Sequence, residues 1–183
     1  MRDLVAYGRA NPGKLNFASG SASSRVAGEM FKAMAGVDMV NVTYRSNPLG
    51  ITDVIAGVAQ VMFVDATTSM PQAREGRVRA IGVTSRERVA MMPDLPTVEE
   101  QGFPGYEMLS WNAIYAPAGT PPEIVARVNG LVNEIMARPA VRERLTASGM
   151  VLRPGSPDDL ARFQASEIEK WKRLVREAGI ELQ

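Results

Sequence analysis

The sequence contains no cysteine and no histidine. Without cysteine, the chain forms no disulfide and supplies no thiolate nucleophile or zinc–thiolate site. Without histidine, it lacks the commonest general base and the commonest metal-binding side chain. A Ser-His-Asp triad therefore cannot be built from this chain alone, and no paired-carboxylate pattern replaces it. We predict that the chain is not an enzyme and that it uses no cofactor or metal.

An excess of charge of one sign is also lacking, because 21 basic and 20 acidic residues give a formal net charge of +1. The sequence has no basic stripe and no basic block with interleaved aromatics, which excludes a nucleic-acid footprint. No apolar run approaches the roughly 18 residues of a membrane-spanning helix. Residues 1–14 lack a basic segment followed by an apolar one, so we expect no secretory signal within them.

What the sequence does contain is an alternation of short apolar runs, polar loops and helical patterns. Apolar residues make up 45% of the chain, which is enough for a buried core. After a first helix at 1–10, strands are predicted at 14–19, 38–44, 58–64 and 78–85, and helices at 23–35, at 49–56 and up to residue 74. The alternation predicts an α/β fold with a parallel sheet and right-handed crossovers.

The rhythm changes after residue 85. An irregular stretch with a short helix at 97–101 precedes a predicted long strand at 106–117, and the rest is predicted to be helical. We divide the chain into an N-terminal helix at 1–10, an α/β ligand-binding lobe at 11–110, and a crossover strand with C-terminal helices at 111–183. The apolar stripes of these helices need another surface to pack on.

The helix starts in the C-terminal part carry sequence signals. Thr120 with Glu123 reads as a capping box around Pro121. Ser156 and Asp159, with Pro157 as the first helical residue, mark the start of the last helix. The last helix is expected to end at Gly179, because glycine commonly follows a helix C-terminus. Trp111 and Trp171 are interpreted as packing residues.

Three polar loops, at 19–24, 45–48 and 65–69, follow the carboxyl ends of predicted strands, where open parallel sheets bind ligands. Each loop leads into a helix N-terminus, whose free N–H groups and partial positive charge suit an anion. The predicted ligand-binding residues are Ser19, Gly20, Ser21, Ala22, Ser23, Ser24, Arg45, Asp65, Thr67 and Thr68.

Each of these residues also has a purely structural interpretation. A serine at a helix start is first of all an N-cap, which stabilises by about 1 kcal/mol with no ligand. Asp65 is more often a cap or turn residue, and Arg45 a solvated surface charge. An enzyme acting on a small anion through either residue is a rival hypothesis, which the missing histidine and the lack of a second titratable group near Asp65 disfavour.

Several motifs occur together: "ANPGKLNFAS", "AGEMFKAMAGVDM", "VRAIGVTS", "PDLPTVEEQGFPGYE" and "YAPAGTP". With them the chain resembles the second lobe and C-terminal segment of the tripartite tricarboxylate transporter substrate-binding proteins, also called the Bug family. The resemblance implies a type II periplasmic-binding-protein fold, with two α/β lobes around a cleft. It also implies capture of a small organic mono- or dicarboxylate, delivery to membrane transporter subunits, and a periplasmic location.

The resemblance further implies that one ligand carboxylate is held between a Gly-rich loop of the first lobe and a Ser/Gly loop of the second. The second of these loops corresponds to residues 19–24, although Ala22 departs from the G-x-G-S-S of many members. We expect the family's first lobe to be missing from this chain, binding by the chain alone to be weak or absent, and the C-terminal helices to form homo-oligomers. The alternative is a stand-alone cytoplasmic ligand-sensing or degenerate binding module with no transport role.

Overall fold

The computed structural model of the protein describes residues 1–177. Its described residues divide into two compact units, one formed by Met1–Ser110 with residues 174–177, the other by Trp111–Arg173. None of the helices between residues 1 and 177 is long and apolar enough to cross a membrane.

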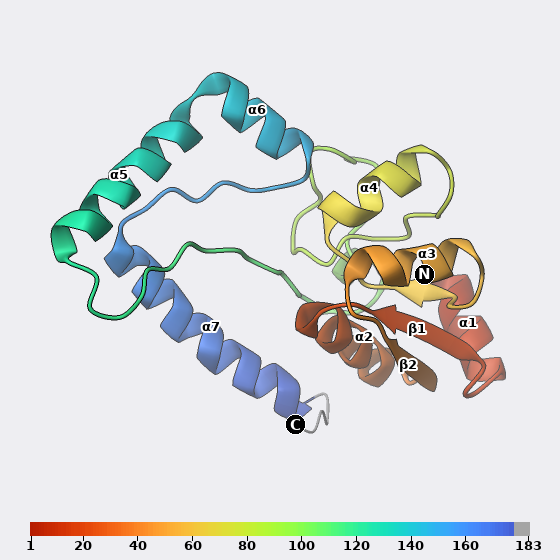
Figure 1. The fold of residues 1–183 in the computed structure, drawn as a ribbon. Helices are drawn as coiled ribbons and strands as arrows, with labels where there is room; N and C mark the ends of the chain where they lie inside the picture. Colours follow the sequence, from red (N-terminus) through yellow and green to blue (C-terminus); the bar gives the residue numbers. More distant parts are fainter. Residues whose placement is uncertain (178–183) are drawn as a thin grey trace. The chain divides into compact units, whose positions relative to one another are not determined.

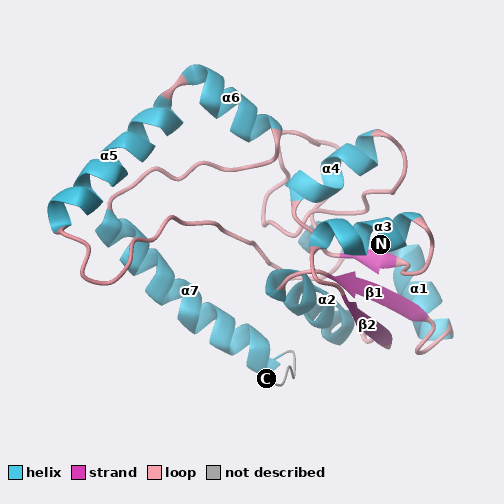
Figure 2. Ribbon diagram, in the orientation of Figure 1, coloured by secondary structure: helices cyan, strands magenta, loops and turns pink. Residues whose placement is uncertain are grey.

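A parallel sheet of three strands forms the centre of the first unit (Figures 1 and 2). Strands β1 (Leu15–Ser19), β2 (Met39–Thr43) and β3 (Val61–Met62) lie in the order β2-β1-β3. Because β1 is central, Phe17 and Ala18 are 0% exposed, whereas Val40 on the edge strand β2 is 47% exposed. The predicted parallel α/β fold is confirmed.

The helices of this unit follow the predicted order. They are α1 (Arg2–Ala10), α2 (Ala22–Ala35), α3 (Asn47–Ile55), α4 (Ala66–Arg74) and the single 3₁₀ turn η1 (Glu99–Gln101). Helix α2 buries Val26, Met30 and Phe31, which recur at helical spacing, and it ends at Gly36 with φ +60°. Gly28 lets α2 approach the sheet, since a Cβ there would lie 2.2 Å from the Phe17 ring.

An aromatic cluster joins the loop after η1 to this core. The ring of Phe31 lies 5.4 Å from that of Phe63 and 5.1 Å from that of Phe103, and the Phe63 and Tyr106 rings are 6.3 Å apart. The Tyr106 hydroxyl, fully buried, donates to the Ala27 carbonyl oxygen at 2.8 Å. Phe103 and Tyr106 are therefore part of the core although they lie outside regular secondary structure.

The predicted fourth strand, 78–85, is wrong. Only Val83 forms an isolated bridge there, with Thr97. Its N–H donates to the Pro96 carbonyl at 3.1 Å, and its carbonyl accepts from Val98 at 2.9 Å. The segment is thus held by the turn at 96–98 instead of by a neighbouring sheet strand, so its apolar run builds no ladder.

The predicted long strand at 106–117, including the crossover strand after residue 111, is also wrong. Met108 N donates to the Thr84 carbonyl at 2.9 Å, but no strand is formed anywhere in 106–117. Ile114 and Tyr115 are 67% and 57% exposed. Alternating apolar residues do not make a strand where no neighbouring backbone pairs with them.

The second unit is helical, with α5 (Pro122–Ala137), α6 (Pro139–Ala147) and the greater part of α7 (Pro157–Glu177). The predicted helix start at Ser156 and Asp159 is confirmed, and the two residues form a capping box: Asp159 N donates to Ser156 Oγ at 3.1 Å and Ser156 N to Asp159 Oδ2 at 2.9 Å. The box predicted at α5 is wrong, because the N-cap of α5 is Pro121 and no side chain caps this helix. The Thr120 hydroxyl donates to the Pro117 carbonyl at 2.8 Å. Gly179 lies outside the described residues.

Both tryptophans pack within the second unit, as predicted. The Trp111 ring meets Phe163 edge-on, with centroids 5.3 Å apart. The indole nitrogens of Trp111 and Trp171 both donate to Glu167 Oε2, at 3.1 and 3.3 Å. One carboxylate on α7 therefore satisfies the two indole N–H groups.

Candidate functional site

The three polar loops lead from the carboxyl ends of β1, β2 and β3 to the starts of α2, α3 and α4 (Figure 1). The first two loops are in backbone contact. A Cβ at Gly20 would lie 2.2 Å from the carbonyl carbon of Ser46 and 2.3 Å from the nitrogen of Asn47. Beside this contact, Tyr44 N donates to the Ser19 carbonyl at 2.7 Å. The absence of a side chain at Gly20 is what permits this approach.

Side chains connect the third loop to the other two. Asn47 Nδ2 donates to Asp65 Oδ2 at 2.7 Å, which links the start of α3 to the N-cap of α4. The Ser24 hydroxyl donates to the carbonyl oxygen of Phe63, just after β3. The structure therefore brings the three predicted loops together at one edge of the sheet.

The start of α2 is open to a ligand. Ser21 is its N-cap, and Ser21 Oγ accepts from Ser24 N at 3.2 Å and lies 3.1 Å from Ser23 Oγ. The backbone N–H groups of Ala22 and Ser23 have no hydrogen-bond acceptor within residues 1–177. Ser21 and Ala22 are exposed. This helix end therefore offers a ligand two backbone N–H donors and a serine hydroxyl. No acidic side chain stands in the first turn of α2.

Ser19 and Ser24 are turned away from that opening. Ser19 is buried, and its hydroxyl donates to Asn41 Oδ1 at 2.7 Å. Ser24 is also buried, with its hydroxyl committed to Phe63. Their hydroxyl hydrogens hold the strands and loops in place, so neither is available to donate to a ligand.

Asp65 caps α4 and is surrounded by donors. Its Oδ1 accepts from Thr68 N and from Thr68 Oγ1, both at 2.9 Å, and from the Thr67 hydroxyl. Burial acts to raise the pKa of Asp65, but the hydrogen bonds from Thr67, Asn47 and Thr68 together hold that pKa below its usual value. Asp65 is therefore a carboxylate that the protein itself places at the start of α4.

This arrangement makes the third loop unlike the first. The hydroxyls of Thr67 and Thr68 both donate to Asp65, so they have no proton left for an anionic ligand. The favourable position for an anion at this helix start is already occupied by the Asp65 carboxylate. The chemistry of the third loop favours a positioning role over direct contact with a carboxylate.

The second loop supplies a cation. Arg45 is exposed and has no hydrogen bond or ion pair with any described residue. Ser46, the N-cap of α3, makes no side-chain cap bond, so α3 also begins without an internal partner for its first donors. The guanidinium of Arg45 and the N-terminus of α3 therefore add positive charge at the sheet edge where α2 also begins.

Sequence reasoning missed Asn41 and Asn47. Asn47 Oδ1 is buried without a partner among the described residues, while its amide nitrogen donates to Asp65. The available signal was the polar residue directly after the N-cap of α3, but its partner lies 18 residues further along the chain. Only the fold brings the two together.

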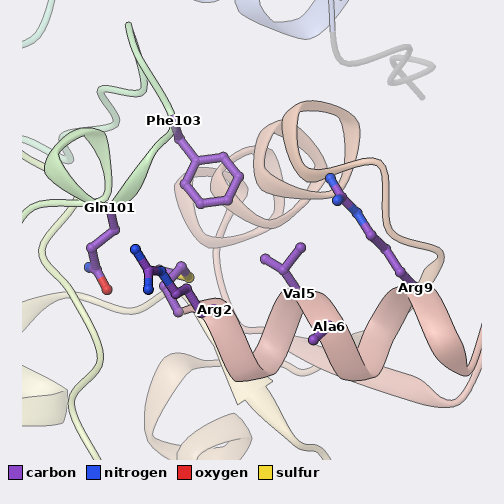
Figure 3. Close-up of a pocket in the computed structure, with 7 residues that line it drawn as sticks. Arg2, Val5, Ala6, Arg9, Gln101 and Phe103 are labelled. Atoms are coloured by element: carbon purple, nitrogen blue, oxygen red, sulfur yellow. The ribbon is translucent and has the colours of Figure 1, made fainter.

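A separate hollow of about 240 Å³ lies between α1 and η1 (Figure 3). It shares no residue with the three loops. Two of its polar side chains are engaged elsewhere: Arg9 donates to the Ala35 carbonyl at 2.7 and 3.1 Å, and Gln101 donates to the carbonyls of Ile81 and Thr97. Val5 and Phe103 add apolar surface, and Arg2 also lines the hollow.

A family model described as "Tripartite tricarboxylate transporter family receptor" matches residues 1–180. A relative from Pseudomonas sp. (strain P51), described as "UPF0065 protein in tcbD-tcbE intergenic region", is 38% identical over 177 residues, 95% of this chain and 53% of the relative. Protein BugT of Bordetella pertussis is 30% identical, over 98% of this chain and 56% of its own length. The chain thus spans about half the length of these curated relatives.

Solved structures agree. Rpa4515 of R. palustris with adipate matches at 31% identity with a TM-score of 0.95, over 98% of this chain and 60% of that one. MatC (Rpa3494) from Rhodopseudomonas palustris, with bound malate, matches at 30% identity with a TM-score of 0.85, over 96% and 61%. The periplasmic binding protein BugD matches at 30% identity with a TM-score of 0.91, over 100% and 62%.

Proposed function

The chain belongs to the tripartite tricarboxylate transporter receptor family, and from that premise we propose that it forms one wall of a binding site for a small organic carboxylate. The protein it serves would be an extracytoplasmic solute-binding protein that delivers this carboxylate to a tripartite tricarboxylate-type transporter. Members of the family are periplasmic solute-binding proteins and not enzymes, which agrees with the predicted absence of catalytic chemistry.

The observation that carries the proposal is the contrast between the helix starts at one sheet edge. Helix α2 begins with neutral Ser21 and two free backbone donors, and Arg45 stands exposed before α3. Helix α4 begins with the carboxylate of Asp65. An incoming carboxylate is attracted to the first two starts and repelled by the third, so we assign the direct contacts to Ser21, Ala22, Ser23 and Arg45.

The other predicted site residues position these contacts. Gly20 allows the first two loops to touch, and Ser19 and Ser24 anchor the first loop to neighbouring strand ends. Thr67 and Thr68 hold Asp65, which in turn holds Asn47. Two relatives of matching fold were solved with adipate and malate, which supports a dicarboxylate as the ligand class.

We further propose that the other wall is supplied by the part of the relatives' length that this chain does not span, since the chain covers 60–62% of three solved relatives. The C-terminal helices at 111–183 would then pack against that part. A single wall leaves the ligand half solvated, so the chain alone is expected to bind in the millimolar range, which corresponds to about 4 kcal/mol.

The test is a titration of the isotope-labelled chain with adipate and with malate, followed through its amide resonances. Shifts are expected at Ala22, Ser23 and Arg45. The matched control ligand is hexane-1,6-diol, which has the length of adipate without its charges and should shift none of them. Shifts confined to other parts of the chain, or equal shifts with the diol, would contradict the assignment.

A second arm uses Ser21→Asp. Aspartate caps a helix as well as serine does, so the fold should persist, but its carboxylate occupies the place of the ligand anion. The adipate shifts should disappear in this variant and weaken in Arg45→Gln, while the control Thr120→Ala keeps them. Micromolar binding by the unaltered chain would contradict the proposal that half of the site lies elsewhere.

A further inference from the structure

Two buried side-chain atoms among residues 1–177 have no hydrogen-bond partner, Nε of Arg25 and Oδ1 of Asn47. Arg25 is the fourth residue of α2 and Asn47 is the first of α3, the two helices whose starts we assign to ligand binding. Buried polar atoms without a partner are uncommon in folded proteins, and each one calls for an explanation. Asn47 still uses its amide nitrogen to hold Asp65, whereas the side chain of Arg25 bonds to no described residue.

Arg25 lies directly behind the open end of α2. It follows Ser21 by four residues and Ala22 by three, so helical periodicity puts the three residues on the same side of the helix. One helical turn is about 5.4 Å long, and the Cα–Cβ bond of a helical residue tilts toward the helix N-terminus. An arginine side chain at this position can therefore reach the end where the two free backbone N–H groups point.

The charged neighbours of Arg25 on α2 do not neutralise it. Glu29 follows Arg25 by four residues, a spacing that suits an ion pair, but its Oε2 lies 3.8 Å from Lys32 Nζ instead. Lys32 Nζ also lies 3.9 Å from Asp38 Oδ1. Arg25 is thus a partly buried cation that has no anion as its partner among the described residues.

The guanidinium of Arg25 is covered on one side only. Its Nε is buried, so the side chain lies against the protein surface and does not extend into solvent. The two Nη atoms make no hydrogen bond to a described residue and are not among the buried atoms. They are therefore held at the surface, free to donate to a carboxylate in the planar geometry that suits one.

We propose that Arg25 binds the second carboxylate of a dicarboxylate whose first carboxylate lies at the backbone N–H groups of Ala22 and Ser23. This inference rests on the proposed function and adds the residue that makes the site prefer dicarboxylates to monocarboxylates. The first carboxylate already has the donors at the end of α2 and the charge of Arg45. Arg25 stands one turn further along α2, where the other end of an extended dicarboxylate can lie.

The test compares adipate with its monoamide, in which a neutral carboxamide replaces one carboxylate at the same chain length. Each ligand is titrated into the isotope-labelled 183-residue chain at neutral pH and low ionic strength, and the amide resonances of Ala22 and Ser23 are followed. The unaltered chain should bind adipate about six- to tenfold more tightly, a twofold statistical factor for two equivalent ends multiplied by three- to fivefold for one partly exposed ion pair.

Arg25→Gln should reduce this preference to about the twofold statistical factor, because the second carboxylate loses its partner. The monoamide should bind this variant almost as it binds the unaltered chain. The matched control is Arg74→Gln, which removes the same charge at the far end of α4 and should keep the full preference. Circular dichroism reports that both variants fold. A preference that survives Arg25→Gln, or an equal loss of affinity for the two ligands, overturns the assignment.

The side chain of Arg25 also gives a direct measurement. Its Nε–H resonance, which is identified by its disappearance in Arg25→Gln, should move with adipate and stay in place with the monoamide. Equal movement with both ligands would put Arg25 at the first carboxylate and overturn the proposal.

The outcomes separate this inference from the proposed function. Shifts at Ala22 and Ser23 with both ligands, combined with an unchanged preference in Arg25→Gln, overturn the role of Arg25 and leave carboxylate binding at α2 intact. No shift at Ala22 and Ser23 with either ligand overturns both. Arg45→Gln should weaken the two ligands by a similar factor, because Arg45 is assigned to the first carboxylate. Loss of the preference in Arg45→Gln instead of in Arg25→Gln overturns the assignment to Arg25.

Discussion

Gly20 and Ser46 are in backbone contact, with a built Cβ on Gly20 only 2.2 Å from the Ser46 carbonyl carbon. This contact fixes the distance between the start of α2 and the start of α3, the two helix ends that we assign to ligand binding. No side chain mediates it, so no rotamer change can relieve a substitution. The position of the loops is therefore a property of the backbone.

Gly20→Ala should destabilise the first unit by about 2–3 kcal/mol, because the added methyl forces two backbone segments apart. Urea denaturation measures the loss. Ala22→Ser, a small change at an exposed position in the same loop, is the control and should stay within about 0.5 kcal/mol of the unaltered chain. Equal stability of both variants would show that the loops separate without cost.

Asp65→Ala should destabilise the chain by about 1–2 kcal/mol at neutral pH, because α4 loses its N-cap. The folded pKa of Asp65 lies below its usual value, so its contribution is fully present above the unfolded pKa of about 4. That contribution is lost as pH falls through the folded pKa.

The measurement is the unfolding free energy of Asp65→Ala and of the unaltered chain at neutral pH and below pH ~3. The difference between them should shrink at acid pH. A difference that stays constant with pH would mean that the ionised carboxylate does not carry the stabilisation.

Tyr106→Phe should destabilise the chain by about 1 kcal/mol at neutral pH, because it removes the hydrogen bond to the Ala27 carbonyl. Burial raises the pKa of Tyr106 well above its usual value. The contribution of Tyr106 to stability should accordingly be fully present below the unfolded pKa of about 10 and be lost as the pH rises above it. Denaturation of both proteins at neutral and alkaline pH is the check, with Tyr115→Phe, at an exposed position, as the control.

Ser156→Ala should increase amide exchange in the first turn of α7, because the capping box loses the hydroxyl that accepts from Asp159 N. Thr120→Ala should leave the first turn of α5 unchanged, since the Thr120 hydroxyl serves the Pro117 carbonyl. The measurement is the amide hydrogen-exchange rate in the first turns of α5 and α7, in both variants and in the unaltered chain. Faster exchange at α5 in Thr120→Ala would restore the predicted capping box there.

The two capping predictions show where sequence reasoning is strong and where it stops. Both pairs, Ser156 with Asp159 and Thr120 with Glu123, have the correct spacing and a following proline. They differ in where the helix begins: α7 begins directly after Ser156, whereas the N-cap of α5 is Pro121, which leaves Thr120 one residue outside the capping position. The same holds for residues 78–85, whose apolar pattern suits a strand but whose hydrogen bonds go to a turn.

The candidate site divides in the same way. Ser21 and Asp65 are recognisable as helix caps because caps are local, and the three loops were placed at one edge because parallel strands end together. The link from Asn47 to Asp65 is not local, and neither is the contact of Gly20 with Ser46. Sequence patterns identified the loops. Which side chain of one loop donates a hydrogen bond to which side chain of another could be known only from the fold.

The division between anchoring and exposed residues in these loops has an evolutionary consequence. Gly20, Ser24, Asn47 and Asp65 hold the loops through contacts that face the protein. Ser21, Ala22 and Arg45 carry none of those loop-to-loop contacts. Mutations at Ala22 and Arg45, and at Ser21 where the new residue still caps α2, are expected to change the preferred solute while leaving the scaffold intact. Receptors that descend from one ancestor can therefore change their ligand through substitutions at a few positions.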